Sequence, residues 1–566
     1  MPSGVAATAP LPSREDALAA AAGRELDVLV VGGGITGAGI ALDAVTRGYR
    51  VALVERDDLA SGTSSRSSKL VHGGVRYLAT GDVAMVAEGV RERDRLRRLA
   101  PHLVRPLGFV LPVDDRATQL QLKAGMAAYD GLALGRNVRR HRRLSVAEVL
   151  AAAPGLATGM SLGGYRYYDC QTDDARLTLQ IAQVARSFGA LVVNHAEVTG
   201  FRRAAGGRVA GAEVRDRLTG RTSELTARWT ISAAGVWADD VRGLATEAPA
   251  GLLPAKGVHL TFPRHLVRVN QAVVVPSGSR DGRRNFVIPW GEQVYVGTTD
   301  ERWDGDPDRP DLEQDEADYL LTSVNAAFAT DLTVADAVGA WAGVRPLLSA
   351  VAAASPGASK DLSRRHAITE DPPGLVTITG GKLTTYRQMA EEAVDVVAAA
   401  DARSCVTTRI PLGARGTAED GLARTREAAR ALDLDPTVAG SVYHRHGDRA
   451  PEVLTACAEG DGAEPLVAGL PYLRGEVRWA VRHELARTVA DVLQRRTRVS
   501  LRDAAAGGAA IAWTADVLAE ELGWDGASRT ASIDAYLEAV RHERGPVALD
   551  TSWRDRDDAA IGTVRS

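Results

Sequence analysis

The sequence contains few cysteines, and their spacing does not indicate a metal or disulfide centre. Its 566 residues include Cys170, Cys405 and Cys457, which lie far apart. They form no CxxC pair and no metal-ligand spacing, which argues against a dithiol redox pair or a zinc site. Three free thiols are typical of a reducing compartment, so we expect a cytoplasmic protein without a bound metal.

Long apolar segments are also lacking. The chain has no run of about 18 apolar residues, the length that a membrane-spanning helix requires. Its first residues lack a basic start followed by a strong apolar block, so we do not expect a secretory signal. The segment from Ser13 to Ala22 instead predicts a short helix, with Ser13 and Asp16 as a capping box.

Charge of neither sign dominates the sequence. Lys and Arg together number 68, and Asp and Glu number 72, which gives a formal net charge of −4. This near-balance argues against a nucleic-acid-binding protein. Lysine is rare, with five residues in the chain, and three of them lie in segments rich in Gly or Ser. These lysines, Lys69, Lys256 and Lys382, draw attention to their segments.

The chain does contain a nucleotide-binding motif near its start. An apolar, β-branched segment is followed by Gly32, Gly34 and Gly37, which form GxGxxG directly before a predicted helix. The three glycines allow a tight turn, a close approach of the backbone to a pyrophosphate, and close packing of the helix on the strand. The helix N-terminus would bind the anion. Glu55 ends the next predicted strand, where the ribose-binding acid of such a motif belongs.

Later glycines favour FAD over NAD as the bound nucleotide. Ala234 and Gly235 follow one predicted strand and Gly381 follows another, so candidate cofactor contacts extend from residue 32 to beyond residue 380. A long dinucleotide requires such a span, although each glycine alone could be an ordinary turn. The sequence has no second GxGxxG for a nicotinamide, and a flavin that takes a hydride directly from the substrate needs none.

The overall pattern predicts an α/β protein in three parts. A βαβ unit indicates a Rossmann-like FAD-binding domain, and strands with Gly- and Asp-rich turns indicate a substrate domain with a mixed or antiparallel sheet. Amphipathic helical spacing indicates a helical C-terminal domain over 405–566. The first two domains are expected to alternate within 25–404. The FAD-binding segments are predicted at about 25–100, 190–250 and 340–404, and the substrate-domain segments at about 101–189 and 251–339.

A second segment, GTSSRSSKLVHGGVRY from Gly62 to Tyr77, concentrates hydroxyl and basic side chains. Clusters of Ser and Thr usually form solvated loops, but this one follows the ribose acid closely enough to reach the cofactor. His72 and Arg76 come later, toward the reacting face, although His72 could have a purely structural role. The cofactor contacts expected from this segment are Thr63, Ser64, Ser67, Ser68 and Lys69.

Two charged groups are interpreted as structural. The run from Arg91 to Arg98 interleaves basic and acidic residues and predicts an exposed helix face. Asp173, Asp174 and Arg176 predict a local group of ion pairs with a helix cap.

The order of several motifs resembles a known family. The motifs are GGGITGAGIALDAVTRG, SSKLVHGGVRYL, YYDCQTDDARL, KGVHL, VIPW, VGTTD, GVRPL and TGGKLTTYRQMAEEAV. Together they resemble the FAD-dependent, quinone-linked glycerol-3-phosphate dehydrogenases over most of residues 25 to about 400, and more loosely beyond. The broader class is similar in fold to D-amino-acid oxidase, and the resemblance implies that architecture here.

The resemblance implies oxidation of sn-glycerol 3-phosphate to dihydroxyacetone phosphate, with transfer of the electrons to a membrane quinone. It also implies a basic cluster for the substrate phosphate, which suits arginine because a guanidinium binds phosphate through two hydrogen bonds. The register at Arg364 is open because Arg365 follows it directly. The substrate-binding residues implied by the motifs are Arg76, Tyr77, Arg345, Arg364 and Lys382.

Three residues are the candidates for catalysis, and the sequence leaves the proton acceptor open. His72 has a suitable intrinsic pKa. Arg345 is implied by the family to lie near the reacting carbon, but arginine is a poor base, so we expect it to orient the substrate and stabilise charge. Lys382 precedes a predicted helix whose N-terminus would stabilise reduced flavin. The resemblance adds Val198, Leu383 and Thr384, together with Lys382, to the cofactor contacts.

One segment could place the protein on a membrane. Residues 120–143 join an apolar helical stretch to the basic run from Arg139 to Arg143, and basic amphipathic segments can lie in a membrane interface. A solvated basic face beside a buried helix is an equal alternative. The resemblance implies peripheral attachment to the inner face of the cell membrane, and the sequence leaves open whether the chain forms a homodimer.

Three other functions are compatible with the same fold. An oxygen-dependent glycerol-3-phosphate oxidase would have a similar site but produce hydrogen peroxide. A flavin-binding sensor without turnover would not need a basic cluster. An FAD-dependent amine or hydroxy-acid oxidase would need fewer arginines than this sequence offers.

Overall fold

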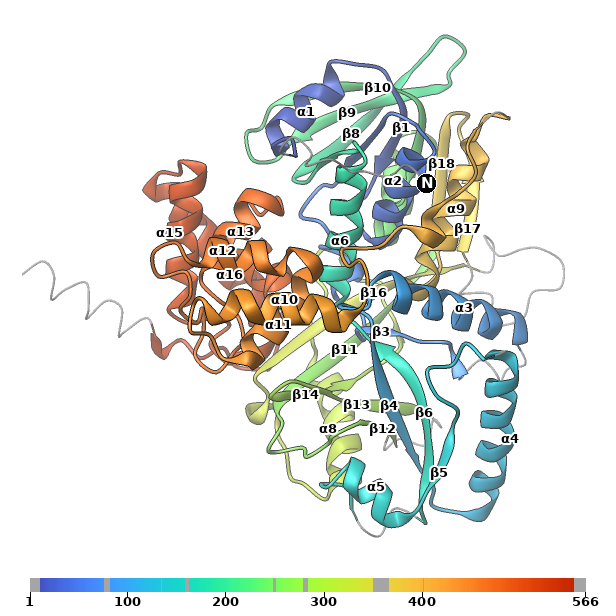
Figure 1. The fold of residues 1–566 in the computed structure, drawn as a ribbon. Coiled ribbons are helices and arrows are strands. Elements are labelled where there is room, and N and C mark those ends of the chain that lie inside the picture. Colours follow the sequence, from blue (N-terminus) through green and yellow to red (C-terminus); the bar gives the residue numbers. More distant parts are fainter. Residues whose placement is uncertain are drawn as a thin grey trace, which may run out of the picture.

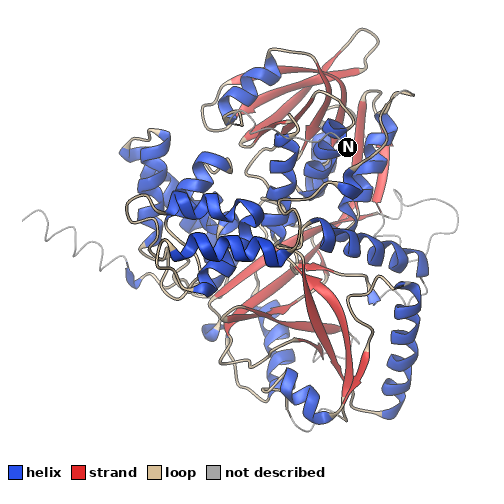
Figure 2. Ribbon diagram, in the orientation of Figure 1, coloured by secondary structure: helices blue, strands red, loops and turns tan. Residues whose placement is uncertain are grey.

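The computed structural model contains two β-sheets with their own helices and a separate helical body (Figure 1, Figure 2). It confirms the predicted fold class, with a Rossmann-like α/β domain, a second domain on a mixed sheet, and a helical C-terminal part. The structure describes residues 11–75, 82–133, 135–157, 162–247, 251–277, 283–349, 366–400 and 402–553.

The first sheet forms around the nucleotide motif. β1 (Leu26–Val31) pairs in parallel with β2 (Val51–Val54) on one side and with β10 (Thr222–Ser232) on the other. β1 and β2 consist almost entirely of buried apolar residues because helices and strands cover both faces, as is usual for parallel strands. The order is β17–β18–β10–β1–β2–β7, with β8 and β9 extending from β10. The other strands are β7 (Leu191–Val193), β8 (Ala196–Arg203), β9 (Val209–Asp216), β17 (His366–Glu370) and β18 (Leu375–Gly380).

The second sheet carries the antiparallel pairs that the sequence predicts. Its order is β15–β11–β14–β13–β12–β4–β6–β3, with β16 on β11 and β5 on β6. β12 and β4 run parallel within it, so the sheet is mixed. The strands are β3 (Leu70–Val71), β4 (Arg105–Pro112), β5 (Arg142–Leu144), β6 (Gly164–Gln171), β11 (Leu252–Pro263), β12 (Ala272–Pro276), β13 (Arg284–Trp290), β14 (Gln293–Gly297), β15 (Glu301–Arg302) and β16 (Gly339–Leu348).

Helices cover both sheets. α2 (Ile35–Thr46) follows β1 and packs against α6 (Asp174–Ser187) and α9 (Tyr386–Val397). α3 (Val83–Leu99) and α4 (Arg116–Ala133) pack against each other and against β6 of the second sheet. The remaining helices of this part are α1 (Arg14–Ala22), α5 (Val146–Ala152), α7 (Ala238–Gly243) and α8 (Gln314–Phe328).

The C-terminal part is a helical body with its own apolar cores, beside both sheets (Figure 1). Its segment Asp491–Arg496 is a π-helix that faces the first sheet domain through α6. The α-helices are α10 (Ala418–Arg430), α11 (Pro436–His446), α12 (Ala450–Cys457), α13 (Gly475–His483), α14 (Val499–Arg502), α15 (Ala510–Leu522) and α16 (Gly526–Arg544).

The two sheet domains exchange more chain than the sequence predicts. β16 lies in the predicted FAD-binding segment 340–404, but it pairs with β11 of the second sheet along its whole length. α6 lies in the predicted substrate segment 101–189, but it packs on α2 of the first domain. Periodicity gives the type of an element and not the sheet that it joins, so these assignments needed tertiary structure.

Two predicted helix caps are present. The Ser13 side chain accepts a hydrogen bond from the backbone three residues later at 3.0 Å, at the start of α1. Asp173 caps α6 by accepting a hydrogen bond from the Arg176 amide at 3.1 Å. The ion pairs of this second group are not local, however, because the Arg176 guanidinium contacts Glu484 of the helical domain at 2.7 Å.

The predicted exposed face of α3 is wrong at Arg93. This side chain is fully buried, and its guanidinium contacts Asp169 at 2.5 Å and the Tyr129 hydroxyl at 2.8 Å. Arg91 on the same helix is exposed. A charge pattern along a helix does not distinguish a solvated arginine from one that pairs with a distant strand, here β6.

We expect Arg93→Met to lower the free energy of unfolding by about 3–5 kcal/mol, because Asp169 would stay buried without its partner. Arg91→Met, on the exposed side of α3, should change it by less than about 0.5 kcal/mol. Denaturant titration followed by tryptophan fluorescence would measure both. Equal effects of the two substitutions would contradict the buried ion pair.

Candidate active site

A cavity of about 1550 Å³ lies between the two sheets. Its nucleotide end is lined by the carboxyl ends of β1 and β2 and by the segment after β10, where ligands bind in open α/β sheets. Its other end is lined by strands of the second sheet and by one face of α4. Among the described residues, the lining comes from the two sheet domains and not from the helical C-terminal domain.

The glycine motif lies at this end of the cavity, between β1 and α2. Gly32 has φ of 107°, and a Cβ there would lie 2.6 Å from the Ala233 carbonyl oxygen. A Cβ at Gly37 would lie 1.9 Å from the Gly32 carbonyl oxygen. Gly37 therefore lets α2 pack directly on the turn after β1, while Gly32 and Gly34 line the cavity. These positions leave backbone-lined space that a pyrophosphate can approach.

Glu55 lines the same end, and the backbone orients its carboxylate. The carboxylate accepts hydrogen bonds from the Gly33 amide at 2.6 Å and the Asp57 amide at 2.8 Å. Burial and the neighbouring Asp57 raise the pKa of Glu55 above its usual value. The held carboxylate has further acceptor capacity for ribose hydroxyls.

The cavity brings together most of the predicted site residues, which come from distant parts of the sequence. Arg76, Tyr77 and Arg364 lie outside the described residues. The predicted residues that line the cavity are Gly32, Gly34, Glu55, Thr63, Ser64, Ser67, Ser68, His72, Val198, Ala234, Gly235, Arg345, Gly381, Lys382, Leu383 and Thr384.

Lys69 departs from its predicted role as a cofactor contact. Its buried ammonium donates to the Ser65 carbonyl oxygen at 3.1 Å and to Asp174 at 3.3 Å, and it lies 4.5 Å from the centre of the Trp341 ring. Burial lowers the pKa of Lys69 to about 8. The side chain therefore supports the serine loop from behind, which the sequence of the loop could not show.

Arg345 is a firmly anchored cation in the cavity wall. It lies on β16, and its guanidinium contacts Asp300 at 3.0 Å and donates to the Thr298 hydroxyl at 3.2 Å. A Cβ at Gly257, on the neighbouring strand β11, would lie 2.3 Å from Arg345 Nη2. Gly257 thus leaves room for the guanidinium, and the VGTTD motif supplies its partners.

Two histidines line the cavity, and their environments differ. His259 is buried and stacks on Trp341, with ring centroids 4.4 Å apart and an interplanar angle of 7°. Its Nε2 lies 2.9 Å from the Ser68 hydroxyl oxygen. Burial, together with the charges of Lys69 and Arg345, holds the pKa of His259 well below its usual value. His259 is therefore a neutral side chain of the wall.

His72 reaches the cavity from the segment after β3. Its backbone amide donates to the Thr384 hydroxyl at 3.2 Å, which joins this segment to the one that carries Lys382. Thr384 belongs to the short 3₁₀ helix Leu383–Thr385 that precedes α9. The predicted helix thus starts later than expected, at Tyr386, and the turn before it faces the cavity.

Sequence reasoning missed several lining residues. His259 stands in the KGVHL motif and Asp300 in VGTTD, two of the motifs that carry the family resemblance. Arg283 and Arg284 also line the cavity, and Arg283 donates to the Asp300 carbonyl oxygen at 2.9 Å. The adjacent basic pair before the VIPW strand was the only sequence signal for these two residues.

The end of the cavity beside α4 is apolar. α4 forms a thin wall here, because one face of the helix lines the cavity while Leu120 on another face is 70% exposed. The α4 residues in the wall recur at helical spacing: Thr118, Gln121, Leu122, Gly125 and Met126. They face apolar residues of the second sheet, which are Phe109, Leu111, Tyr167, Val274 and Phe286.

Comparison with known proteins identifies the family. Residues 27–387 match the family described as FAD dependent oxidoreductase, and residues 405–529 match the C-terminal domain of alpha-glycerophosphate oxidase. A glycerol-3-phosphate dehydrogenase of Mycobacterium leprae is 39% identical over 528 residues, which cover 92% of this chain and 88% of that protein. A mitochondrial glycerol-3-phosphate dehydrogenase of Arabidopsis thaliana is 36% identical over 553 residues, with 92% and 87% covered.

A solved structure agrees with these relatives. The glycerol-3-phosphate dehydrogenase from Bacillus halodurans, complexed with FAD, is 32% identical, has a TM-score of 0.78, and covers 95% of this chain and 99% of its own. This chain belongs to the FAD-dependent glycerol-3-phosphate dehydrogenase family. Glycine oxidase from Geobacillus kaustophilus, at 18% identity and a TM-score of 0.50 over 69% of this chain and 100% of its own, shares the fold alone.

The cavity of this family member fits FAD, the cofactor of the family. Glycine backbone at Gly32 and Gly34 suits the pyrophosphate, and Glu55 suits the ribose. The lining then continues through the serine loop to Lys382, over a length that a flavin dinucleotide can occupy. The predicted cofactor is therefore confirmed at the level of the family.

The arrangement at Gly37 predicts the effect of one added methyl group. Gly37→Ala should weaken FAD binding more than tenfold, because the new Cβ must displace α2 from the turn after β1. The visible flavin absorbance of the purified protein measures the bound cofactor. Gly243→Ala is the matched control, since a Cβ there meets open space at the end of α7. Retention of FAD by the Gly37 variant would contradict this packing.

Proposed function

We propose that this protein oxidises sn-glycerol 3-phosphate to dihydroxyacetone phosphate, with FAD as hydride acceptor, and passes the electrons to a membrane quinone. The observation that carries the proposal is the anchored Arg345 guanidinium in the cavity that also contains His72 and Lys382, beside the segments that fit FAD. The names of relatives that match 92% of the chain support the same substrate.

The cations of the cavity account for recognition of a phosphorylated alcohol. Arg345 is held by Asp300 in one orientation, so little conformational entropy is lost when it binds phosphate oxygens. Arg283 and Arg284 add two guanidinium groups to the lining, and Lys382 adds an ammonium group. A planar guanidinium can bind a phosphate through two parallel hydrogen bonds, which an uncharged alcohol would not satisfy.

We propose that His72, rather than His259, accepts the hydroxyl proton. Oxidation of the secondary alcohol breaks its C–H bond and its O–H bond and forms the ketone. The low pKa of His259 makes it a poor acceptor for the hydroxyl proton. His72 lies in the same lining, and histidine is the side chain most often used as a general base near neutral pH. We assign Arg345 to substrate orientation and charge stabilisation because arginine remains protonated.

FAD supplies the acceptor for the hydride when it is bound. The residues Gly381 to Thr384 lie where they can stabilise the negative charge that accompanies this step, because they precede the N-terminus of α9 and include Lys382. Backbone N–H groups at a helix start and a nearby ammonium both favour an anion. The apolar side chains around the reacting end limit access of water.

Glycerol 3-phosphate should bleach the flavin of the purified holoenzyme in the absence of oxygen, whereas glycerol should not. Gly257→Ala should keep FAD but lower the rate of bleaching at least tenfold, since its Cβ would displace the Arg345 guanidinium from its position. Stopped-flow absorbance measures the rate, and Gly243→Ala again provides the control with open space.

The same experiment separates the alternatives. Bleaching by amino acids or hydroxy acids in place of glycerol 3-phosphate would refute the proposed substrate. Rapid hydrogen peroxide formation after oxygen is admitted, with no transfer to a quinone analogue, would favour a glycerol-3-phosphate oxidase. Absence of bleaching by any of these compounds would favour the flavin-binding sensor.

The apolar wall at α4 supports a lipid-soluble electron acceptor. This helix separates the apolar end of the cavity from the surface, and its outer face carries Leu120. Exposed arginines follow it on the segment that leads into β5: Arg136, Arg139, Arg140, Arg142 and Arg143. An exposed apolar residue beside a basic cluster is typical of a surface that lies on an anionic membrane.

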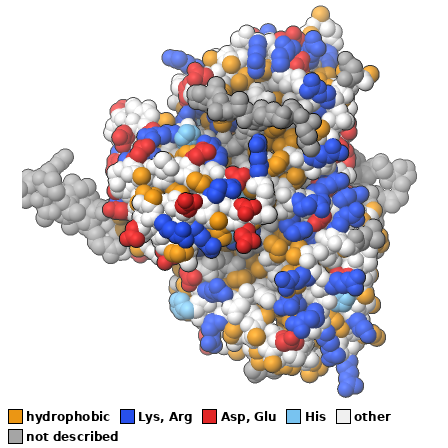
Figure 3. Space-filling model, in the orientation of Figure 1, with side chains coloured by type: hydrophobic (Ala, Val, Ile, Leu, Met, Phe, Trp, Pro, Cys, Tyr) orange, Lys and Arg blue, Asp and Glu red, His pale blue; other side chains and the backbone are white. Residues whose placement is uncertain are grey.

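The charge of the surface around α3 and α4 is consistent with contact between α4 and an anionic membrane. Figure 3 shows many Lys and Arg side chains on the side of the molecule where α3 and α4 lie. Among the described residues, none of the helices has both the length and the apolar character of a membrane span. We therefore propose peripheral attachment through α4 and the basic segment, with the quinone entering beside α4.

Charge reversal at two of these arginines tests the attachment. Arg139→Glu with Arg140→Glu should weaken binding to vesicles that contain anionic lipid by roughly 30-fold, because each arginine near such a surface contributes about 1 kcal/mol. Vesicle sedimentation at low salt measures the affinity. The matched control is Arg426→Glu with Arg430→Glu on α10, where both arginines are also exposed. An equal loss of vesicle affinity in both double variants would contradict attachment through α4 and the basic segment.

A further inference from the structure

The helical C-terminal domain contributes no described side chain to the cavity lining, yet its arginines contact segments that carry the lining. Its segment from residue 484 to residue 498 contacts the parts of the chain that carry the lining. The helical domain can therefore influence the cavity only by holding these lining segments in position.

The first contact holds the loop after the ribose-binding acid. Asp58 lies three residues after Glu55, in a loop whose neighbours Arg56 and Ser61 line the cavity. The Asp58 carboxylate is fully buried. It accepts hydrogen bonds from Arg495 Nε at 2.6 Å and from Arg496 Nη1 and Nη2 at 2.6 and 2.9 Å.

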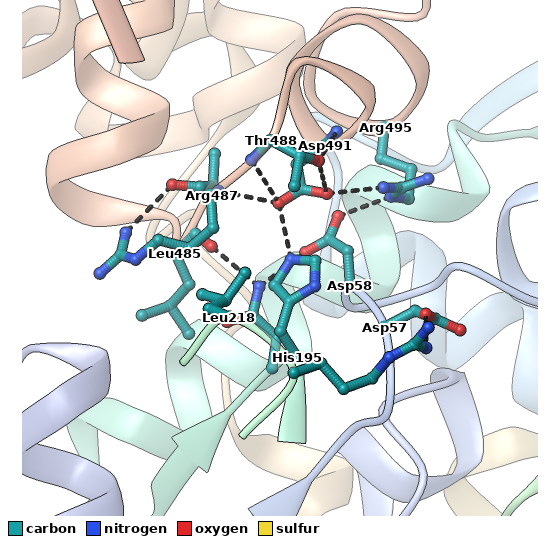
Figure 4. A network of polar contacts seen from close by, with 12 residues as sticks. Asp57, Asp58, His195, Leu218, Leu485, Arg487, Thr488, Asp491 and Arg495 are labelled. Carbon is teal, nitrogen blue, oxygen red and sulfur yellow. Dashed lines mark hydrogen bonds and ion pairs between the residues drawn. The ribbon is translucent and has the colours of Figure 1, made fainter. Parts of the chain in front are cut away.

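The second contact holds the segment that begins β8. His195 directly precedes the lining residues 196–199. Its Nε2 lies 3.0 Å from Asp491, whose other carboxylate oxygen accepts from Arg495 Nη2 at 2.8 Å (Figure 4). Burial lowers the pKa of His195, but the charge and hydrogen bond of Asp491 and the charge of Asp58 together raise it by more, so the pKa lies above its usual value.

The two held segments are also joined to each other. The His195 amide donates to the Asp57 carbonyl oxygen at 2.6 Å, and the Ala196 amide donates to the Glu55 carbonyl oxygen at 2.7 Å. Movement of either segment would therefore move the other. Both segments depend on the same π-helical turn, Asp491–Arg496, of the helical domain.

A metal ion is an alternative reading of this cluster, because ligand atoms of Asp58, His195 and Asp491 lie within 4.8 Å of one another. The contacts argue against it. Arg495 and Arg496 donate directly to the carboxylate oxygens that would bind the ion. A divalent cation would have to enter beside two guanidinium groups, so we interpret the cluster as an ion-pair network.

A third contact reaches the serine loop. Arg498 donates to the Ser65 carbonyl oxygen at 3.2 Å and also pairs with Asp174. Asp174 in turn accepts hydrogen bonds from the Ser67 amide at 3.0 Å and the Ser67 hydroxyl at 2.7 Å. The helical domain thus contacts three lining segments from behind: the loop after Glu55 through Arg495 and Arg496, the start of β8 through Asp491, and the serine loop through Arg498.

We propose that Arg495, Arg496 and Asp491 are positioning residues for FAD. They hold the loop after Glu55 and the start of β8 in the geometry that binds the adenosine half of the cofactor, so that the helical domain sets the affinity for FAD. Binding segments that are already ordered lose less conformational entropy on association, and this lowers the release rate of the ligand.

The test is the release of FAD from the holoenzyme after dilution, followed by flavin fluorescence. Arg496→Gln should release FAD at least tenfold faster than the unsubstituted protein, and an excess of free FAD should restore its activity. Arg176→Gln is the matched control. It removes another buried arginine of the same domain interface, bound to Glu484 at 2.7 Å, but Arg176 contacts none of the three lining segments. This control should release FAD within threefold of the unsubstituted rate.

A triple variant checks that the effect passes through Asp58. If Arg495 and Arg496 both act through this carboxylate, adding Asp58→Asn to the variant Arg495→Gln with Arg496→Gln should accelerate release by less than threefold beyond that variant alone. An effect of Asp58→Asn as large in this background as in the unsubstituted protein would overturn the proposal. So would equal acceleration by Arg176→Gln, or unchanged release from a folded Arg496 variant. If Arg496→Gln does not fold, His195→Gln replaces it, and unchanged FAD release from that variant would equally overturn the proposal.

Discussion

The close contact between Gly37 and the Gly32 carbonyl oxygen determines where the nucleotide end of the cavity lies. A side chain at Gly37 would separate α2 from the turn after β1, and a side chain at Gly32 would meet the Ala233 carbonyl oxygen at the end of β10. Because the packing is direct, the start of α2 stands beside the end of β1 and across from Glu55. The serine loop, the β10 turn and the segment before α9 are then arranged around this end by the parallel sheet.

Ion pairs hold distant segments of this protein together, and those of Lys69 and Asp58 are buried. Arg345 on β16 is oriented by Asp300, Lys69 by Asp174, and Asp58 by two arginines of the helical domain. Removing such charges from water is costly, and the cost is offset only when the partners and their hydrogen bonds are well placed. Networks of this kind therefore contribute less to overall stability than to the selection of one arrangement of loops.

Each of the three domains makes a different contribution to the cavity. The first sheet provides backbone and Glu55 for the nucleotide, and the second provides Arg345, His259 and the apolar end of the cavity. The helical domain provides the ion pairs behind the lining. A guanidinium group, a neutral histidine and an apolar wall can thus stand in one cavity although they come from β16, β11 and α4.

The sequence by itself determined the fold class, the glycine motif, the position of Glu55 after β2 and a part of the cavity lining, because these depend on local spacing and on motifs that are contiguous in the chain. Tertiary structure decided the rest. Lys69 and Arg93 were misassigned because a charged side chain can find a buried partner far away in the sequence, and local pattern carries no information on that partner. The neutral state of His259 and the role of Arg496 likewise arise from burial and from neighbours that only folding brings together.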